Sequence, residues 1–179
     1  MPSISKSHRW SEVKRCVSTY DSKDLIRLLQ DLYEISAENK RFLHARCLGR
    51  EAERGEYRKR IIAAVYPDPL GSRSVQVHEA LRMIRQYQRA SGDFEGTVDL
   101  FLAALEAGVE QAVDLGMYEE YFSSLTNMVE AFVQIDQELP SDERRKTRAR
   151  FLEIAKRGNR IGWGFGDYLQ ETLATLEES

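Results

Sequence analysis

The sequence predicts an all-α protein of eight or nine antiparallel helices, packed as a bundle or as a short superhelix of αα-hairpins. Apolar residues recur at helical spacing along most of the 179 residues, and the strict alternation of a half-buried strand is nearly absent. Hydrophobic residues make up 42% of the chain and charged residues 31%, which suits helices with one buried and one solvated face. The connections between the periodic segments are short, as in antiparallel hairpins.

The first two predicted helices are separated by a cap signal. The first covers residues 7–20, and the second follows Asp21, whose short side chain can accept a hydrogen bond from an amide of the next turn. The first helix places Trp10, Val13, Val17 and Tyr20 on one face. The second has its expected core-facing stripe at Leu25, Leu28, Leu29 and Leu32.

A third helix is expected after a cap at Ser36, and a fourth ends at Tyr66. The run 67–72 is the clearest loop in the chain, because each of its two prolines disfavours helix in the preceding residue. We therefore expect one domain over residues 1–179, with any division into subdomains at 67–74.

Periodicity is stronger in the second half of the chain. Apolar stripes cover 77–87, 98–113 and 118–132, and a helix with an acidic first turn begins at Pro140 and runs to about Gly158. A short final helix is expected over residues 168–176.

Two neighbouring helices in this half carry charged stripes of opposite sign. Basic residues follow i, i+4, i+7 and i+11 spacing at His78, Arg82, Arg85 and Arg89. Acidic residues occupy one stripe of the next helix at Asp99, Glu106, Glu110 and Asp114. Helical phase predicts that both stripes lie on the same side of the hairpin, tilted away from the seam.

The stripes have two interpretations. One is a solvated surface with weak ion pairs, each worth about 0.2–1 kcal/mol. The other is a docking surface for a protein partner, with contacts expected from His78, Arg82, Arg85, Arg89, Glu106 and Glu110. A helical di-metal site is not expected, because no histidine is preceded at three residues by Glu.

The main concentration of basic residues lies at 144–160. A nucleic-acid interface would use Arg144, Arg145, Arg148 and Lys156 as phosphate contacts. The apolar residues interleaved with them indicate an ordinary amphipathic helix, and the net charge of −3 disfavours a polyanionic partner.

Alternating glycines make residues 158–167 the most unusual stretch. We expect Trp163 and Phe165 to fill a groove in the helical bundle and Asp167 to cap the last helix. A phosphate-binding loop is disfavoured, because the preceding segment is helical and Asp167 would repel an anion.

Signatures of catalysis are missing from the sequence. It contains no G-x-x-x-x-G-K-[ST], H-E-x-x-H or G-x-S-x-G motif, so neither enzymatic activity nor a cofactor or metal is expected. Cys16 and Cys47 are expected to be reduced core residues, with a Cys47–His44 pair as the alternative.

Sequence features also bear on the cellular compartment. No apolar run approaches the ~20 residues of a membrane span, and the first residues lack the apolar stretch of a secretory signal. A cytoplasmic protein without a membrane partner is expected.

Two motifs suggest a family. The stretches LQDLYEISAENKRFL at 29–43 and GWGFGD at 162–167, together with the middle segment 80–132, resemble a family of uncharacterised bacterial proteins. The resemblance implies a single all-helical domain of bacterial type and brings no catalytic or binding residues with it.

Taken together, these features predict a non-enzymatic helical scaffold that binds another protein, or a second copy of itself, through the 78–114 surface. The alternative is a nucleic-acid-binding regulator that uses the basic helix at 144–160.

Overall fold

The computed structural model describes residues 9–48 and 50–178. These residues form nine α-helices and no strand, which confirms the predicted all-α class. The helices are α1 (Trp10–Val17), α2 (Ser22–Ile35), α3 (Ala37–Cys47), α4 (Arg50–Val65), α5 (Val77–Ser91), α6 (Phe94–Leu115), α7 (Glu119–Asp136), α8 (Ser141–Gly158) and α9 (Phe165–Glu178).

The chain divides into two compact units, Met1–Leu43 and His44–Ser179. The loop at 67–74, where the sequence places any division into subdomains, joins α4 to α5 inside the second unit, and the boundary between the two units lies near residue 43. A proline-rich loop can be the turn of one hairpin as readily as a linker, because proline restricts the backbone in both settings.

The first unit is built on local cap interactions. Asp21 Oδ1 accepts a hydrogen bond from the Asp24 amide at 2.9 Å, and Ser36 Oγ accepts one from the Asn39 amide at 3.0 Å, as the sequence predicts. Neither α1 nor α2 has a buried residue. The leucine stripe of α2 therefore does not form the predicted core, and Leu29 is 47% exposed.

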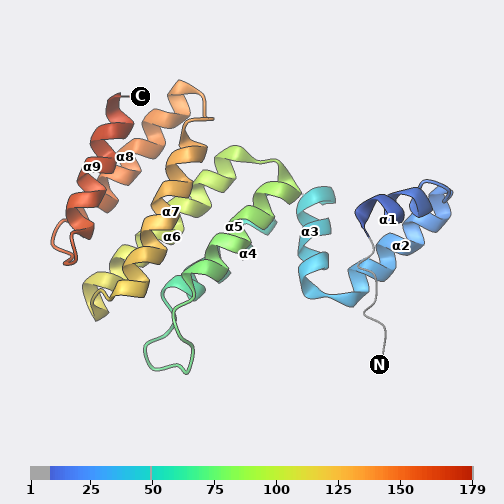
Figure 1. Cartoon of the computed structure of the whole chain (residues 1–179), viewed down its shortest axis with the longest axis horizontal. Helices are drawn as coiled ribbons and strands as arrows, with labels where there is room; N and C mark the ends of the chain where they lie inside the picture. The colour runs from blue at the N-terminus through green and yellow to red at the C-terminus, as the bar shows by residue number, and fades with distance from the viewer. Residues whose placement is uncertain (1–8, 49, 179) are drawn as a thin grey trace. The chain divides into compact units, whose positions relative to one another are not determined.

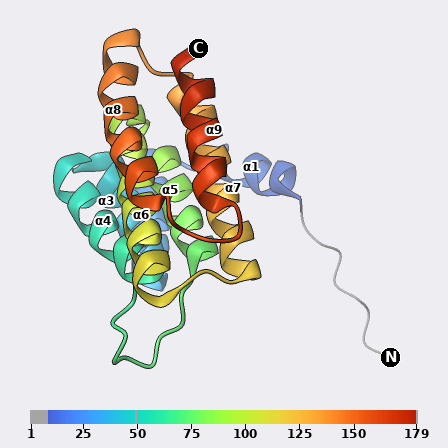
Figure 2. The ribbon, with the colours of Figure 1, turned by 90° about the vertical axis from the view of Figure 1, so that its left-hand side faces the viewer.

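The second unit consists of three αα-hairpins, α4–α5, α6–α7 and α8–α9, placed side by side (Figure 1). Their first helices, α4, α6 and α8, form one layer, and their second helices, α5, α7 and α9, form the other (Figure 2). We call these the first and second layers. Each hairpin buries its apolar face against the next, which is the principle of an α-hairpin superhelix.

Helix α6 is the centre of this unit, and most of its residues from Gly96 to Ala112 are buried. Gly108 allows a close approach of α7, where Tyr121 Oη donates to the Gly108 carbonyl at 2.9 Å. Phe132 of α7 stacks on Phe151 of α8, with ring centroids 5.1 Å apart.

The glycine-rich connection between α8 and α9 differs in part from the prediction. Phe165 is fully buried as expected, but Trp163 is 60% exposed and fills no groove. Trp163 and Gly164 both have positive φ angles, 64° and 73°, so the chain reverses tightly and α9 begins three residues earlier than predicted. Asp167 consequently lies in the first turn of α9 instead of capping it.

The two cysteines were expected in the core, and this expectation is wrong. Cys16 and Cys47 are free but exposed. Both belong to the first three helices, which bury only Ala45 among their described residues.

Candidate functional site

The basic residues of α5 form an exposed stripe along one side of the helix. His78, Arg82, Arg85 and Arg89, called the basic stripe below, are all exposed. With Leu81 and Gln88 they line a shallow surface hollow of about 460 Å³. The opposite face of α5 anchors the helix, because Ile84 and Tyr87 are fully buried.

The basic stripe is only partly neutralised within the chain. Arg82 forms two hydrogen bonds of 2.8 Å with the carboxylate of Glu79, one turn earlier. His78 Nε2 lies 3.4 Å from Ser124 Oγ of α7. Arg85 and Arg89 have no ion-pair or hydrogen-bond partner for their side chains in the part of the chain that the structure describes.

The acidic stripe of α6 does not share this surface, contrary to the prediction. Asp99 Oδ2 lies 3.0 Å from Arg58 Nη1 of α4, and Arg150 of α8 binds both Asp99 and Glu106. These partners belong to the first layer, whereas the basic stripe belongs to a second-layer helix whose His78 approaches α7. The first-layer helices α4 and α8 flank α6, and their arginines bind two of its carboxylates.

The rest of the acidic stripe divides similarly. Asp114 and Glu110 are both exposed, but Asp114 accepts a hydrogen bond of 2.5 Å from the Tyr66 hydroxyl. That hydrogen bond is also the main cause of a raised Tyr66 pKa. Of the two acidic residues predicted to contact a partner, Glu106 is half-buried and paired with Arg150, and Glu110 is exposed.

The pKa values of Asp99 and Arg150 are shifted by the ion pairs around α6. Burial alone would raise the pKa of Asp99, but the hydrogen bond from Arg150 and the charge of Arg58 outweigh it and hold that pKa below its ordinary value. The hydrogen bond to Glu106 raises the pKa of Arg150 further. Arg58 and Arg150 are not among the residues predicted from the sequence, because their positions relative to α6 depend on how the hairpins stack.

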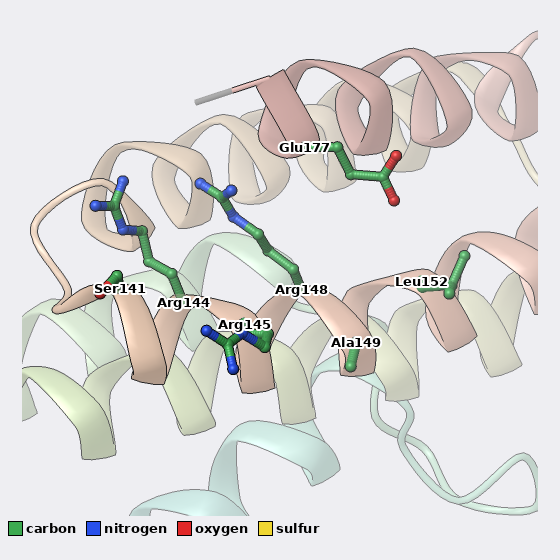
Figure 3. Close-up of a pocket in the computed structure, with 7 residues that line it drawn as sticks. All are labelled: Ser141, Arg144, Arg145, Arg148, Ala149, Leu152 and Glu177. Atoms are coloured by element: carbon green, nitrogen blue, oxygen red, sulfur yellow. The ribbon is translucent and has the colours of Figure 1, made fainter.

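A second candidate site lies between α8 and α9. It is a groove of about 440 Å³ lined by Ser141, Arg144, Arg145, Arg148, Ala149, Leu152 and Glu177, called the α8–α9 groove below (Figure 3). Three of the four residues predicted to contact nucleic acid thus come together in one groove, and Lys156 is not part of it.

Most of these basic residues face acidic partners. Arg148 Nε lies 3.3 Å from Oδ2 of the fully buried Asp136. Arg145 lies 3.5 Å from Asp142, with both side chains more than 80% exposed. Lys156 Nζ lies 2.8 Å from Glu153 Oε1. This pairing disfavours a continuous positive surface of the kind that nucleic acid requires.

Other predicted arrangements are not formed. His44 Nδ1 lies 3.2 Å from Glu53 Oε1, and Cys47 is exposed, so His44 and Cys47 do not make the pair considered as an alternative.

Within residues 9–48 and 50–178, no cluster of three His, Cys, Asp or Glu side chains could hold a metal ion. None of the helices described there has the length and apolar character needed to cross a bilayer.

Comparison of the chain with protein-family models, with curated proteins and with solved structures finds no match.

Proposed function

We propose that this protein is a non-catalytic interaction module whose basic stripe on α5 binds an acidic segment of a partner protein. One observation carries the proposal. Asp99 and Glu106, which the sequence places beside the basic stripe, are bound by arginines of neighbouring helices. Arg85 and Arg89 therefore lack a partner among the described residues.

The stripe is suited to binding because its side chains project from a fixed backbone. Ile84 and Tyr87 hold α5 in the core, so a partner meets Arg82, Arg85 and Arg89 at successive turns about 5 Å apart. A preorganised row of one charge speeds encounter with an oppositely charged segment and selects against basic ones.

A different protein is a better partner than a second copy of this chain. A second copy would have to offer an acidic surface, and two of its four acidic-stripe residues are already bound to Arg58 and Arg150. The exposed free thiols Cys16 and Cys47 fit a reducing bacterial cytoplasm, where we place the protein.

The test is fluorescence anisotropy of a labelled poly-glutamate peptide at low and at physiological salt. We expect the double variant Arg85→Glu, Arg89→Glu to weaken binding about tenfold or more, since each exposed ion pair contributes up to about 1 kcal/mol and reversal adds repulsion. The matched control is Arg157→Glu, Arg160→Glu, which makes the same change in net charge at exposed positions outside α5.

Equal loss of binding in the two double variants would mean that net charge alone drives binding and would contradict the proposal. Absence of binding by the wild-type protein at low salt would contradict it too.

A further inference from the structure

The α8–α9 groove combines three chemistries in a fixed order along α8. Arginine side chains lie at its start, an apolar floor of Ala149 and Leu152 follows, and the carboxylate of Glu177 lies on α9. Figure 3 shows Arg144 and Arg148 extending to the side of the groove on which α9 lies, whereas Arg145 points the other way.

Arg144 is the guanidinium available to a ligand. Arg148 is positioned by Asp136, and Arg145 lies beside Asp142. No hydrogen bond or ion pair engages the Arg144 side chain in the described part of the chain, and Ser141 places a hydroxyl one turn away on the same helix. A planar guanidinium can bind one carboxylate group at two points, and the Ser141 hydroxyl is a further donor on the same helix.

Charge balance favours a ligand with one negative charge over a polyanion. Three arginines line the groove, but Asp136, Asp142 and Glu177 bring three carboxylates to it or to its arginines. A phosphate dianion or a nucleic-acid strand would add two or more negative charges to a site that is already neutral, and Glu177 would repel its further phosphates. A single carboxylate adds only one.

The remaining surface indicates what is attached to that carboxylate. Arg144 and Leu152 are eight residues apart on α8, which corresponds to ~12 Å along the helix. An extended peptide covers that distance in about three residues. Ala149 and Leu152 offer contact to an apolar side chain, and Glu177 has acceptor oxygens for backbone N–H groups.

We propose that the α8–α9 groove binds the C-terminus of a peptide whose third residue from the end is apolar, with the terminal carboxylate on Arg144 and the apolar side chain over Ala149 and Leu152. This site is separate from the basic stripe and does not depend on the function proposed for it.

The experiment titrates the isotope-labelled full-length protein with N-acetyl-Leu-Ala-Ala, either as the free acid or as the carboxamide, and follows backbone amide shifts by NMR. We expect the acid to shift amides of 141–152 and of Glu177. The carboxamide should bind at least about tenfold more weakly, because it lacks the charge. Arg144→Gln should cause a similar loss, while Arg157→Gln, at an exposed position outside the groove, should leave binding unchanged.

Each other result overturns the proposal. Equal shifts from acid and carboxamide would show that the carboxylate is not recognised. The absence of shifts would show that the groove does not bind this peptide. N-acetylleucine binding as tightly as the tripeptide would assign the groove to small carboxylic acids instead. A single-stranded oligonucleotide shifting these amides when the peptide does not would assign it to nucleic acid. Unchanged resonances outside the groove in Arg144→Gln verify that this variant is folded.

Discussion

Arg150 of α8 binds Glu106 of α6 at two points, with Nε 2.5 Å from Oε1 and Nη2 2.8 Å from Oε2. Its Nη1 also donates to Asp99 Oδ1 at 2.6 Å. Arg58 of α4 completes the network from the other side through both oxygens of Asp99. Four side chains thus connect all three helices of the first layer, and bidentate geometry of this kind fixes register as well as adding stability.

Replacing Arg150 by Met should lower the free energy of unfolding by about 1–2 kcal/mol, measured by urea denaturation at neutral pH. The network is about one-third exposed, so solvent screening keeps the loss below that of a fully buried pair. Arg145→Met is the control, since Arg145 and its partner Asp142 are both exposed and the loss should stay within about 0.5 kcal/mol. Equal losses in the two variants would show that the network does not stabilise the helix stack.

Asp99 makes the stability of the fold dependent on pH. The pKa of Asp99 is lowered in the folded protein, so its contribution is present above the unfolded-state pKa of about 3.9 and is lost as pH falls through the folded value. Asp99→Asn removes this titration. We expect the difference in unfolding free energy between wild type and Asp99→Asn to shrink as pH is lowered from 6 to about 3. A difference that stays constant over this range would mean that Asp99 is not held by Arg58 and Arg150.

The contrast between these network residues and the helix caps shows what the sequence could predict. Asp21 and Ser36 cap helices through amides three residues away, and such contacts follow from local sequence. Arg150 and Asp99 are 51 residues apart, and their contact requires knowing that α4 and α8 flank α6 in one layer. Helical phase placed the acidic residues on one face correctly but could not tell which helix would cover that face.

A similar limit applies to the exposed leucines and to the glycine-rich turn. Leu29 lies in a regular apolar stripe, but the stripe gives no information on whether a neighbour is present to bury it. In the turn, Trp163 adopts a positive φ angle that aromatic residues seldom take, so its outward position could not be anticipated from hydrophobicity. Three residues of the α8–α9 groove, Arg144, Arg145 and Arg148, were predicted from the sequence as a binding site. No sequence feature indicated that Glu177 lies beside them.

Asp136 should be one of the most sensitive polar positions in the second unit. It is fully buried, and its two oxygens accept from Thr147 Oγ1 at 2.5 Å and from Arg148 Nε at 3.3 Å. Asp136→Ala leaves both donors without their acceptor and should cost about 3 kcal/mol in urea denaturation. Asp136→Asn keeps an acceptor for Thr147 and should cost less. If Asn proves as harmful as Ala, the charge pairing with Arg148 outweighs the hydrogen bond to Thr147.

Gly166 and Gly55 should respond in opposite directions to the same substitution. A Cβ at Gly166 would lie 2.7 Å from the Asn159 carbonyl oxygen and 2.9 Å from that of Gly158. These are backbone atoms at the end of α8 and directly after it, so they cannot rotate aside, and Gly166→Ala should destabilise the protein by about 1–3 kcal/mol. A Cβ at Gly55 of α4 would meet nothing within 4 Å, and Gly55→Ala should stabilise by about 0.5–1 kcal/mol, because alanine loses less backbone freedom in a helix. Thermal unfolding of both variants measures the two signs. A neutral Gly166→Ala would show that the tight reversal after α8 can open at no cost and that α9 does not depend on it.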